Sequence, residues 1–221
     1  MAIAPAPRIS LAGSGALLLD GAQASFDDHT QELVWAVAEA ARALDGVREI
    51  VPGMNNLLVV FDPLVTDASN IGKQLQSLWA VTDPQAVPGT LHRIPVNYGG
   101  PHGEDLAGWA AHCGLSLEET VNRHVSATYS VAAIGAMPGF PYLSGLDPRL
   151  TWPRRNNPRL KVAEGAVIIG GAQAGIMPMT APSGWHIIGH TDVRLFDIQA
   201  QSPVLLRPGD KIRFEIASME P

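Results

Sequence analysis

The hydrophobic pattern of the first eighty residues predicts two amphipathic helices set among three strands. Apolar side chains recur at helical spacing in two stretches, namely Leu33, Val34, Val37, Ala38, Ala41 and Leu44, and then Ile71, Leu75, Leu78 and Trp79. Asp27 or Asp28, with Gln31 as a capping-box partner, and Asp67 stand where the two N-caps belong. Apolar runs at Gly15–Asp20, Val47–Val51 and Leu57–Phe61 predict strands.

These elements follow one another in the order β-α-β-β-α, which becomes a ferredoxin-like unit if Leu91–Val96 supplies a final strand. Residues 1–12 are rich in proline and alanine, and we expect them to be loose. Thr82–Gly89 contains two prolines and a glycine, which end any helix, so we interpret it as a linker. The sequence therefore predicts an α+β domain over residues 1–85 and a second domain over residues 90–221.

The second half of the chain begins with two short helices and continues with strands and turns. Asp105–Cys113 predicts a helix closed by Gly114, and Ser116 with Glu119 forms a capping box that opens a helix to about Val125. The clearest strands beyond Tyr129 are Val167–Ile169, Trp185–Ile188, Val193–Phe196, Val204–Leu206 and Lys211–Ile216. Many short strands with regular turn signals indicate a small barrel or a sandwich.

Composition narrows the class of protein. The 221 residues are 46% hydrophobic and 16% charged, which is typical of a globular chain with a core. A net charge of −6 gives no reason to expect binding to nucleic acid or to a membrane. Cys113 is the single cysteine, so no internal disulfide can form. We find neither a signal peptide nor an apolar run of transmembrane length, so we expect a cytoplasmic protein.

A basic loop between positions 149 and 161 is the strongest chemical signal. It holds five of the 15 lysines and arginines in 13 positions, with no acidic residue between them. Arg154, Arg155 and Arg159 are its centre, and arginine forks bind carboxylates and phosphates with two bonds. Two interpretations remain open: an anion site for a substrate, a nucleotide or an acidic partner, and a solvated loop with scattered surface ion pairs.

Other catalytic motifs are missing from the sequence. The seven histidines show no HxH or HExxH spacing, so no metal site is predicted. There is no GxSxG elbow, no Walker motif and no GxGxxG after a strand. His186 follows Trp185 and is either a proton carrier or an ordinary polar strand position. Phe140, Tyr142 and Trp185 either line a pocket or plug the end of a barrel.

Three stretches carry a resemblance to a known family: GAMPGFPYLSGLDPRLTWPRRNNPRLKV, GGAQAGIMP and APSGWHIIGHTDVRLFD. They resemble the KipI / allophanate hydrolase subunit 1 family, which includes the B-type component of the bacterial ATP-dependent 5-oxoprolinase. The likeness continues upstream through IPVNYGGPHGEDL and so covers nearly the whole chain. It implies that the C-terminal domain is a cyclophilin-like β-barrel.

The resemblance also implies a shared reaction. Family members pair with a C-type component, which is allophanate hydrolase subunit 2-like, and in 5-oxoprolinase a TIM-barrel-type subunit completes the enzyme. ATP activates the lactam oxygen, and hydrolysis converts 5-oxoproline to glutamate, so the chain alone would be inactive. The implied site residues are Arg154, Arg155 and Arg159 for anions, Gln173 as a polar contact, His186 as proton carrier, and Phe140, Tyr142 and Trp185 as the pocket wall.

Four positions depart from the family pattern: Asn97, Ala174, Met177 and His190. Three of these changes remove a polar group that the family commonly places there, which leaves room for a divergent activity. Two alternatives therefore stay open. One is a KipI-type inhibitor of a sensor histidine kinase, and the other is a carboxyltransferase-type subunit resembling part of urea carboxylase.

Overall fold

Residues 6–22, 25–83 and 89–220 are described in the computed structural model of this chain, which divides into two units, Met1–Pro88 and Gly89–Pro221. Each unit has a hydrophobic core of its own. The predicted linker falls largely on residues 84–88, which lie outside the described residues. None of the described helices is long and apolar enough to cross a membrane.

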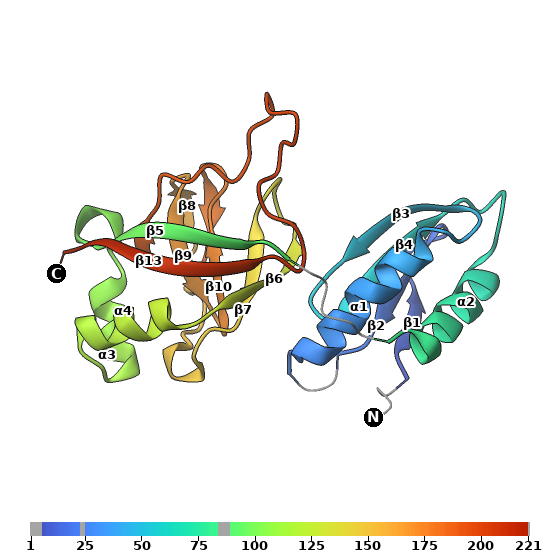
Figure 1. The fold of residues 1–221 in the computed structure, drawn as a ribbon, viewed down its shortest axis with the longest axis horizontal. Helices are drawn as coiled ribbons and strands as arrows, with labels where there is room; N and C mark the ends of the chain where they lie inside the picture. The colour runs from blue at the N-terminus through green and yellow to red at the C-terminus, as the bar shows by residue number, and fades with distance from the viewer. Residues whose placement is uncertain (1–5, 23–24, 84–88, 221) are drawn as a thin grey trace. The chain divides into compact units, whose positions relative to one another are not determined.

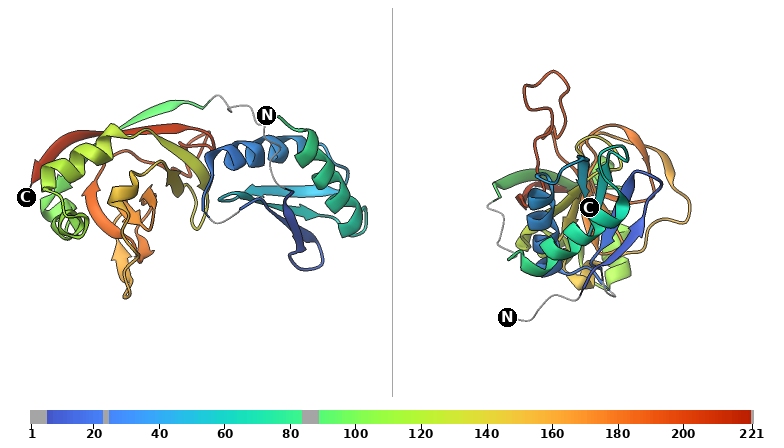
Figure 2. Two further views of the ribbon diagram at one scale, coloured as in Figure 1. Left: turned by 90° about the horizontal axis from the view of Figure 1, so that it is seen from below. Right: turned by 90° about the vertical axis from the view of Figure 1, so that its right-hand side faces the viewer.

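The N-terminal unit is an antiparallel sheet with two helices on one face (Figure 2). Its strands are β1 (Arg8–Leu11), β2 (Ala16–Asp20), β3 (Val47–Pro52) and β4 (Asn56–Phe61), in the order β1-β2-β4-β3. The helices are α1 (Asp28–Ala41) and α2 (Ala68–Val81). Their apolar stripes are buried, as the helical spacing predicts, and they cover the inward-facing side chains of β2 and β4.

The fourth strand of this sheet differs from the sequence prediction. Arg8–Leu11, which we expected to be loose, is strand β1 and pairs with β2 in a register that sets Arg8 opposite Asp20. Leu91–Val96, which we expected to complete the unit, belongs to the other unit. A hairpin partner close in sequence takes the edge position, because it closes a much shorter loop. The four-stranded, two-helix arrangement expected of a ferredoxin-like unit is kept.

The predicted helix caps form, with one change. Asp27 accepts a hydrogen bond from the Thr30 amide, and Asp67 accepts one from the Asn70 amide. The N-cap is Asp27, so Gln31 lies one position beyond the capping-box site. Its side chain instead donates to the Gly53 carbonyl and accepts from the Asn55 amide, which ties α1 to the β3–β4 turn.

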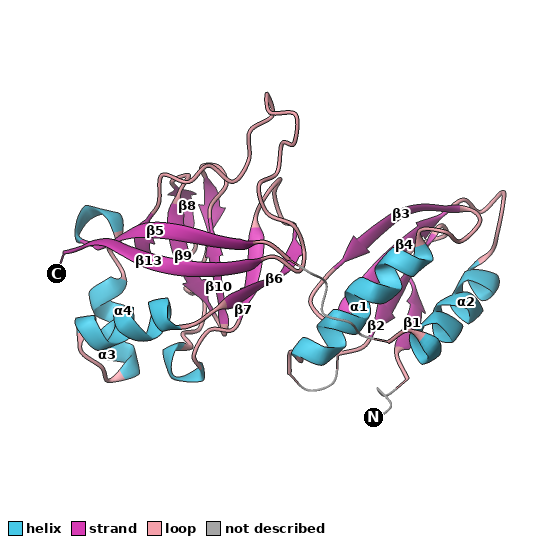
Figure 3. Cartoon of the chain, in the orientation of Figure 1, coloured by secondary structure: helices cyan, strands magenta, loops and turns pink. Residues whose placement is uncertain are grey.

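The C-terminal unit is a closed barrel, which confirms the expected α+β fold class (Figures 1 and 3). Its seven strands follow the order β10-β7-β6-β13-β5-β12-β9. Two long parallel strands, β5 (Leu91–Gly99) and β13 (Lys211–Glu220), lie side by side along it. The others are β6 (Tyr129–Ile134), β7 (Pro141–Ser144), β9 (Ala166–Gly170), β10 (Gln173–Ile176) and β12 (His186–His190).

Helices and a small ribbon surround the barrel. Two α-helices, α3 (Leu106–Cys113) and α4 (Leu117–Ser126), pack on its core with Leu106, Trp109 and Val121. Two 3-10 turns, η1 (Gly100–His102) and η2 (Pro148–Leu150), flank them. Strands β8 (Arg159–Val162) and β11 (Ala181–Ser183) form a separate two-stranded ribbon. As predicted, Gly114 ends α3 in the left-handed conformation and Ser116 caps α4.

Two predicted strands do not form. Val193–Phe196 and Val204–Leu206 are apolar, but they contribute only one isolated bridge, between Phe196 and Val204. Leu195 and Leu206 are nevertheless buried in the barrel core. The apolar pattern therefore indicated burial correctly, and the loop carries these side chains inward without a ladder of hydrogen bonds.

Candidate functional site

One buried carboxylate connects the basic loop to the barrel. Asp105 precedes α3, and both of its oxygens accept from Arg159, at 2.8 and 2.9 Å. Arg155 donates to the same carboxylate at 3.2 Å, and the Ile187 amide of β12 donates at 2.8 Å. Glu104 adds a second acid beside Arg159, at 3.2 Å. Glu104 and Asp105, which precede α3, therefore pair with two of the five cations of this loop, Arg155 and Arg159.

The charge state of Asp105 follows from these contacts. Burial by itself would raise the pKa of its carboxyl group, but the hydrogen bonds from Arg159 and Ile187 and the charges of both arginines outweigh burial and hold the pKa below its usual value. In turn, the hydrogen bond to Asp105 raises the pKa of Arg159. Asp105 is therefore ionised at neutral pH, and Arg155 and Arg159 already have an anionic partner.

A cavity of about 420 Å³, open to solvent, lies beside this cluster. Its lining residues are His112, Trp152, Pro153, Arg154, Arg155, Asn156, Asn157 and His186. They are mainly hydrogen-bond donors and aromatic rings, with two guanidinium groups and no carboxylate. Such a lining suits a small anionic or amide-containing ligand.

Stacked rings hold one wall of the cavity. The Trp152 ring lies parallel to the His186 ring, with centroids 3.5 Å apart. The His112 ring also stacks on Trp152, with centroids 5.4 Å apart. The Trp152 backbone exchanges two hydrogen bonds with Gly171 in the β9–β10 turn, at 2.7 and 3.2 Å. The cavity wall is therefore fixed by both ring and backbone contacts.

His186 is buried, and its contacts define its tautomer. Nε2 lies 2.8 Å from the Pro153 carbonyl oxygen, which can only accept, so Nε2 carries the hydrogen. Nδ1 then holds a lone pair, is 4.0 Å from Asp105 Oδ2, and has no hydrogen-bond partner among the described residues. Burial lowers the pKa of His186 and keeps the ring neutral at pH 7. The ring is therefore held through Nε2, and Nδ1 is the nitrogen that takes up a proton when the ring titrates.

The predicted anion-binding residues have different surroundings. Arg154 is exposed and lies over the Trp185 ring, 5.3 Å from its centroid, and it makes no ion pair with any described residue. Arg155 and Arg159 are held by Asp105. Gln173 lies on β10 opposite Gly170, at the hairpin that Trp152 bridges. Arg154 is therefore the predicted cation best placed to receive a ligand.

The three aromatic residues that we expected to form a pocket wall contact one another. Phe140, Tyr142 and Trp185 meet edge to face with centroids 5.0 to 6.2 Å apart. Phe140 is 4% exposed and Trp185 is 6% exposed. A side chain at Gly170 would come within 2.5 Å of the Trp185 ring, so this glycine leaves the space that the ring fills. Trp185 therefore lies close against the backbone at Gly170.

Two residues of the site carried no clear sequence signal. Asp105 looks like an ordinary residue at the start of a helix, and His112 looks like a polar residue on its exposed face. The four positions that depart from the family pattern are elsewhere. Asn97 accepts from Ser218, Ala174 and Met177 are buried, and His190 contacts the Glu164 carbonyl. None of the four belongs to the described lining of the cavity.

Comparisons with known proteins cover most of the chain. Residues 7–206 match the family described as "Carboxyltransferase domain, subdomain C and D". The B-type component of 5-oxoprolinase from Escherichia coli is 43% identical over 185 residues, which are 84% of this chain and 85% of that protein.

Two solved structures are also similar to this chain. The crystal structure of TTHA0988 is similar with a TM-score of 0.79 and 33% identity, over 93% of this chain; this chain spans only 40% of that longer one. Kluyveromyces lactis urea amidolyase shares the fold, with a TM-score of 0.83 and 19% identity, over 99% of this chain and 15% of that one.

Proposed function

Because this chain belongs to the family of the carboxyltransferase domain, subdomain C and D, we propose that it is the B-type component of a complex that hydrolyses a cyclic amide with ATP, converting 5-oxoproline to glutamate. The observation that carries the proposal is the 43% identity to the B-type component of 5-oxoprolinase over 84% of the chain. A C-type component and a TIM-barrel-type subunit would complete the enzyme.

The cavity supports this proposal chemically. Hydrolysis of an activated lactam places negative charge on the amide oxygen and on a transferred phosphoryl group, and both need fixed donors. Arg154, Arg155, Asn156 and Asn157 line the cavity with hydrogen-bond donors, and no acid of the described lining repels an anion. The substrate carboxylate is a suitable partner for Arg154, whose guanidinium group has no anionic partner among the described residues.

The segment of residues 170–175, which contains three glycines, does not fit ATP. Gly170 and Gly175 face the Trp185 ring, and the segment joins β9 to β10 with no helix after it to supply a positive end. No residue of this segment is therefore assigned to ATP. ATP enters the proposal as a substrate of the assembled complex.

A carboxyltransferase activity is the second candidate, and the description of the matching family favours it. This activity would require a biotin carrier as a partner, and its substrate would not be a lactam. Reconstitution separates the two proposals. A complex that consumes ATP and releases glutamate from 5-oxoproline supports the first, and transfer of the carboxyl group from a carboxybiotinylated carrier to an acceptor such as urea supports the second. The isolated chain should be silent in both assays.

Replacing Arg154 with alanine should weaken ligand binding by about 1.5–3 kcal/mol, the range for a hydrogen bond to a charged group. Lysine should restore only part, because a point charge cannot make the two-bonded fork. The measurement is calorimetric affinity of the assembled complex for 5-oxoproline.

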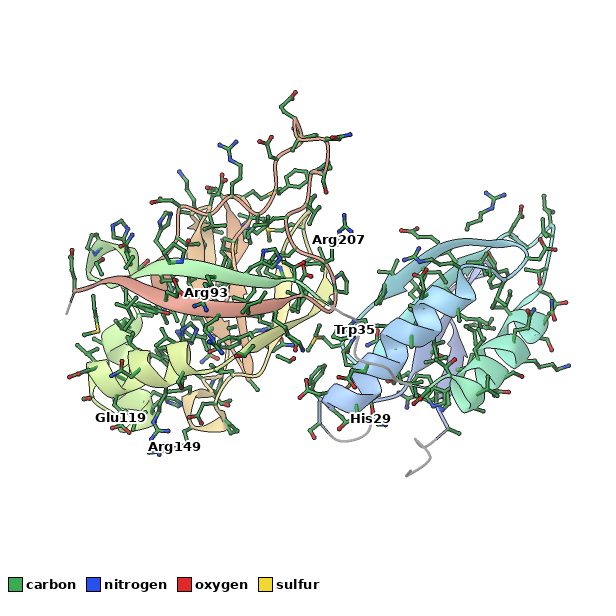
Figure 4. All side chains as sticks on the ribbon, viewed as in Figure 1. His29, Trp35, Arg93, Glu119, Arg149 and Arg207 are labelled. Atoms are coloured by element: carbon green, nitrogen blue, oxygen red, sulfur yellow. The ribbon has the colours of Figure 1, made fainter. Side chains whose placement is uncertain are left out.

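Arg149 supplies the matched control. It is exposed on η2, outside the cavity lining, and projects from the lower edge of the barrel unit in Figure 4. Arg149→Ala should leave affinity unchanged. Equal losses in the two variants, or none in Arg154→Ala, would remove Arg154 from the site.

A further inference from the structure

We propose that Asp105 is the positioning residue of the cavity, holding Arg155 and Arg159 in place beside His186. The inference rests on the proposed function only for what the cavity binds, since the positioning itself is a property of this chain. Asp105 is 9% exposed and joins three elements: the start of α3, the basic loop and β12. Nothing about its sequence context predicts this role.

The geometry fixes both ends of the cavity-lining segment. Arg155 and Arg159 bracket Asn156 and Asn157, and both guanidinium groups end on the same carboxylate. The backbone adds to this, because the Arg155 amide donates to the Gly184 carbonyl at 2.7 Å. A loop tied at both ends presents its donors at a lower entropic cost than a free loop would.

Helix capping does not account for Asp105. It occupies the N-cap position of α3, yet its side chain accepts no hydrogen bond from the first turn of that helix. Its carboxylate faces the arginines and the Ile187 amide instead. The Asp105 amide also donates to the Ile187 carbonyl at 2.9 Å, so α3 and β12 are joined twice at this point.

The same cluster sets the charge around His186. Asp105 faces the ring from the start of α3, Arg155 from the loop and Arg159 from β8, while His112 lies beyond Trp152. Burial has the largest effect and lowers the pKa of His186, while the hydrogen bond to Pro153 raises it. Among the nearby charges, Asp105 raises this pKa, and Arg155 and Arg159 lower it. Removing Asp105 alone should therefore lower the pKa of His186, and removing Arg159 alone should raise it.

The test uses the full chain and the His186 ring signals in an NMR titration. Asp105→Asn should move the His186 midpoint to lower pH, and Arg159→Gln should move it to higher pH. The double variant should lie between the two. Opposite shifts show that this charge cluster faces the ring, and a loss of packing does not produce them. If Asp105→Asn fails to fold, Arg159→Gln still decides, because an unmoved midpoint in that variant overturns the proposal.

Asp210 is the matched control. It is another buried carboxylate of the barrel unit, 7% exposed, that accepts backbone hydrogen bonds from Thr90 and Arg207 away from the cavity. Asp210→Asn should lower the melting temperature as Asp105→Asn does, yet leave the His186 midpoint unchanged. If Asp105→Asn likewise leaves the midpoint unchanged, Asp105 is a stability residue only and the proposal fails.

A second readout concerns the ligand. In the assembled complex, Asp105→Asn should lower kcat/KM for 5-oxoproline by about 10²-fold, the loss expected from a misplaced binding wall. Asp210→Asn should not lower it. If the unmodified complex shows no 5-oxoproline turnover, the proposed function fails, while the NMR titration still decides whether Asp105 positions the site.

Discussion

Replacing Trp185 with alanine is expected to lower the free energy of unfolding of the barrel unit by about 3–5 kcal/mol. The ring is 6% exposed, contacts Phe140 and Tyr142, and fills the space that Gly170 leaves. Its removal leaves a cavity that the barrel strands cannot close. Denaturant unfolding, followed by a signal from the barrel unit, measures the change.

Leu160→Ala is the control for this prediction, because Leu160 is 88% exposed and its truncation should leave stability unchanged. Trp185→Phe should recover part of the lost stability. The sequence left open whether the aromatic residues line a pocket or plug the barrel. Weaker ligand binding with unchanged stability in Trp185→Ala would favour the pocket wall and contradict the packing described above.

His186→Ala is expected to lower kcat/KM of the assembled complex by about 10²-fold, as mispositioning of a binding wall does. The variant removes the stacking partner of Trp152 and the donor to the Pro153 carbonyl, so the cavity wall is released. Steady-state kinetics with 5-oxoproline measure the effect.

His186→Gln separates two roles of this residue. The glutamine amide can replace the Nε2 donor to Pro153, so an anchoring role predicts substantial recovery of activity. A proton carrier predicts that both variants lose about 10²–10⁴-fold, because an amide does not exchange protons near pH 7. The hydrogen bond to Pro153 and the buried Nδ1 favour anchoring.

Local sequence signals predicted the helices well because caps and periodicity act over a few residues. Asp67 and Ser116 each accept a hydrogen bond from a backbone amide in the first turn of the helix that they cap. Gly114 directly follows the last residue of α3 and ends that helix. Short apolar runs and turn residues record burial directly and indicated a barrel or a sandwich, and the family resemblance chose the barrel. These features need no knowledge of distant parts of the chain.

The errors concern pairings between distant or competing segments. Leu91–Val96 has an apolar pattern that suits either unit, and only its parallel ladder with β13, more than a hundred residues away, places it in the barrel. Arg8–Leu11 has too little apolar pattern to be recognised as an edge strand without its partner β2.

The candidate site shows the same limit. The clustering of Arg154, Arg155 and Arg159 was visible in sequence, but their different surroundings were not. The acid that holds two of them, Asp105, lies about fifty positions earlier. Charge pairing at such separation leaves no local pattern, so the sequence could predict an anion site but could not identify which arginine is available to a ligand.

The central claim is tested most directly by reconstitution. This chain is co-expressed with a C-type component and a TIM-barrel-type subunit, and glutamate release from 5-oxoproline is measured with and without ATP, with the isolated chain as control. The account predicts glutamate from the assembled complex only when ATP is present, and none from the isolated chain. An assembled complex that leaves 5-oxoproline unchanged with ATP present, or turnover by the isolated chain, would contradict it.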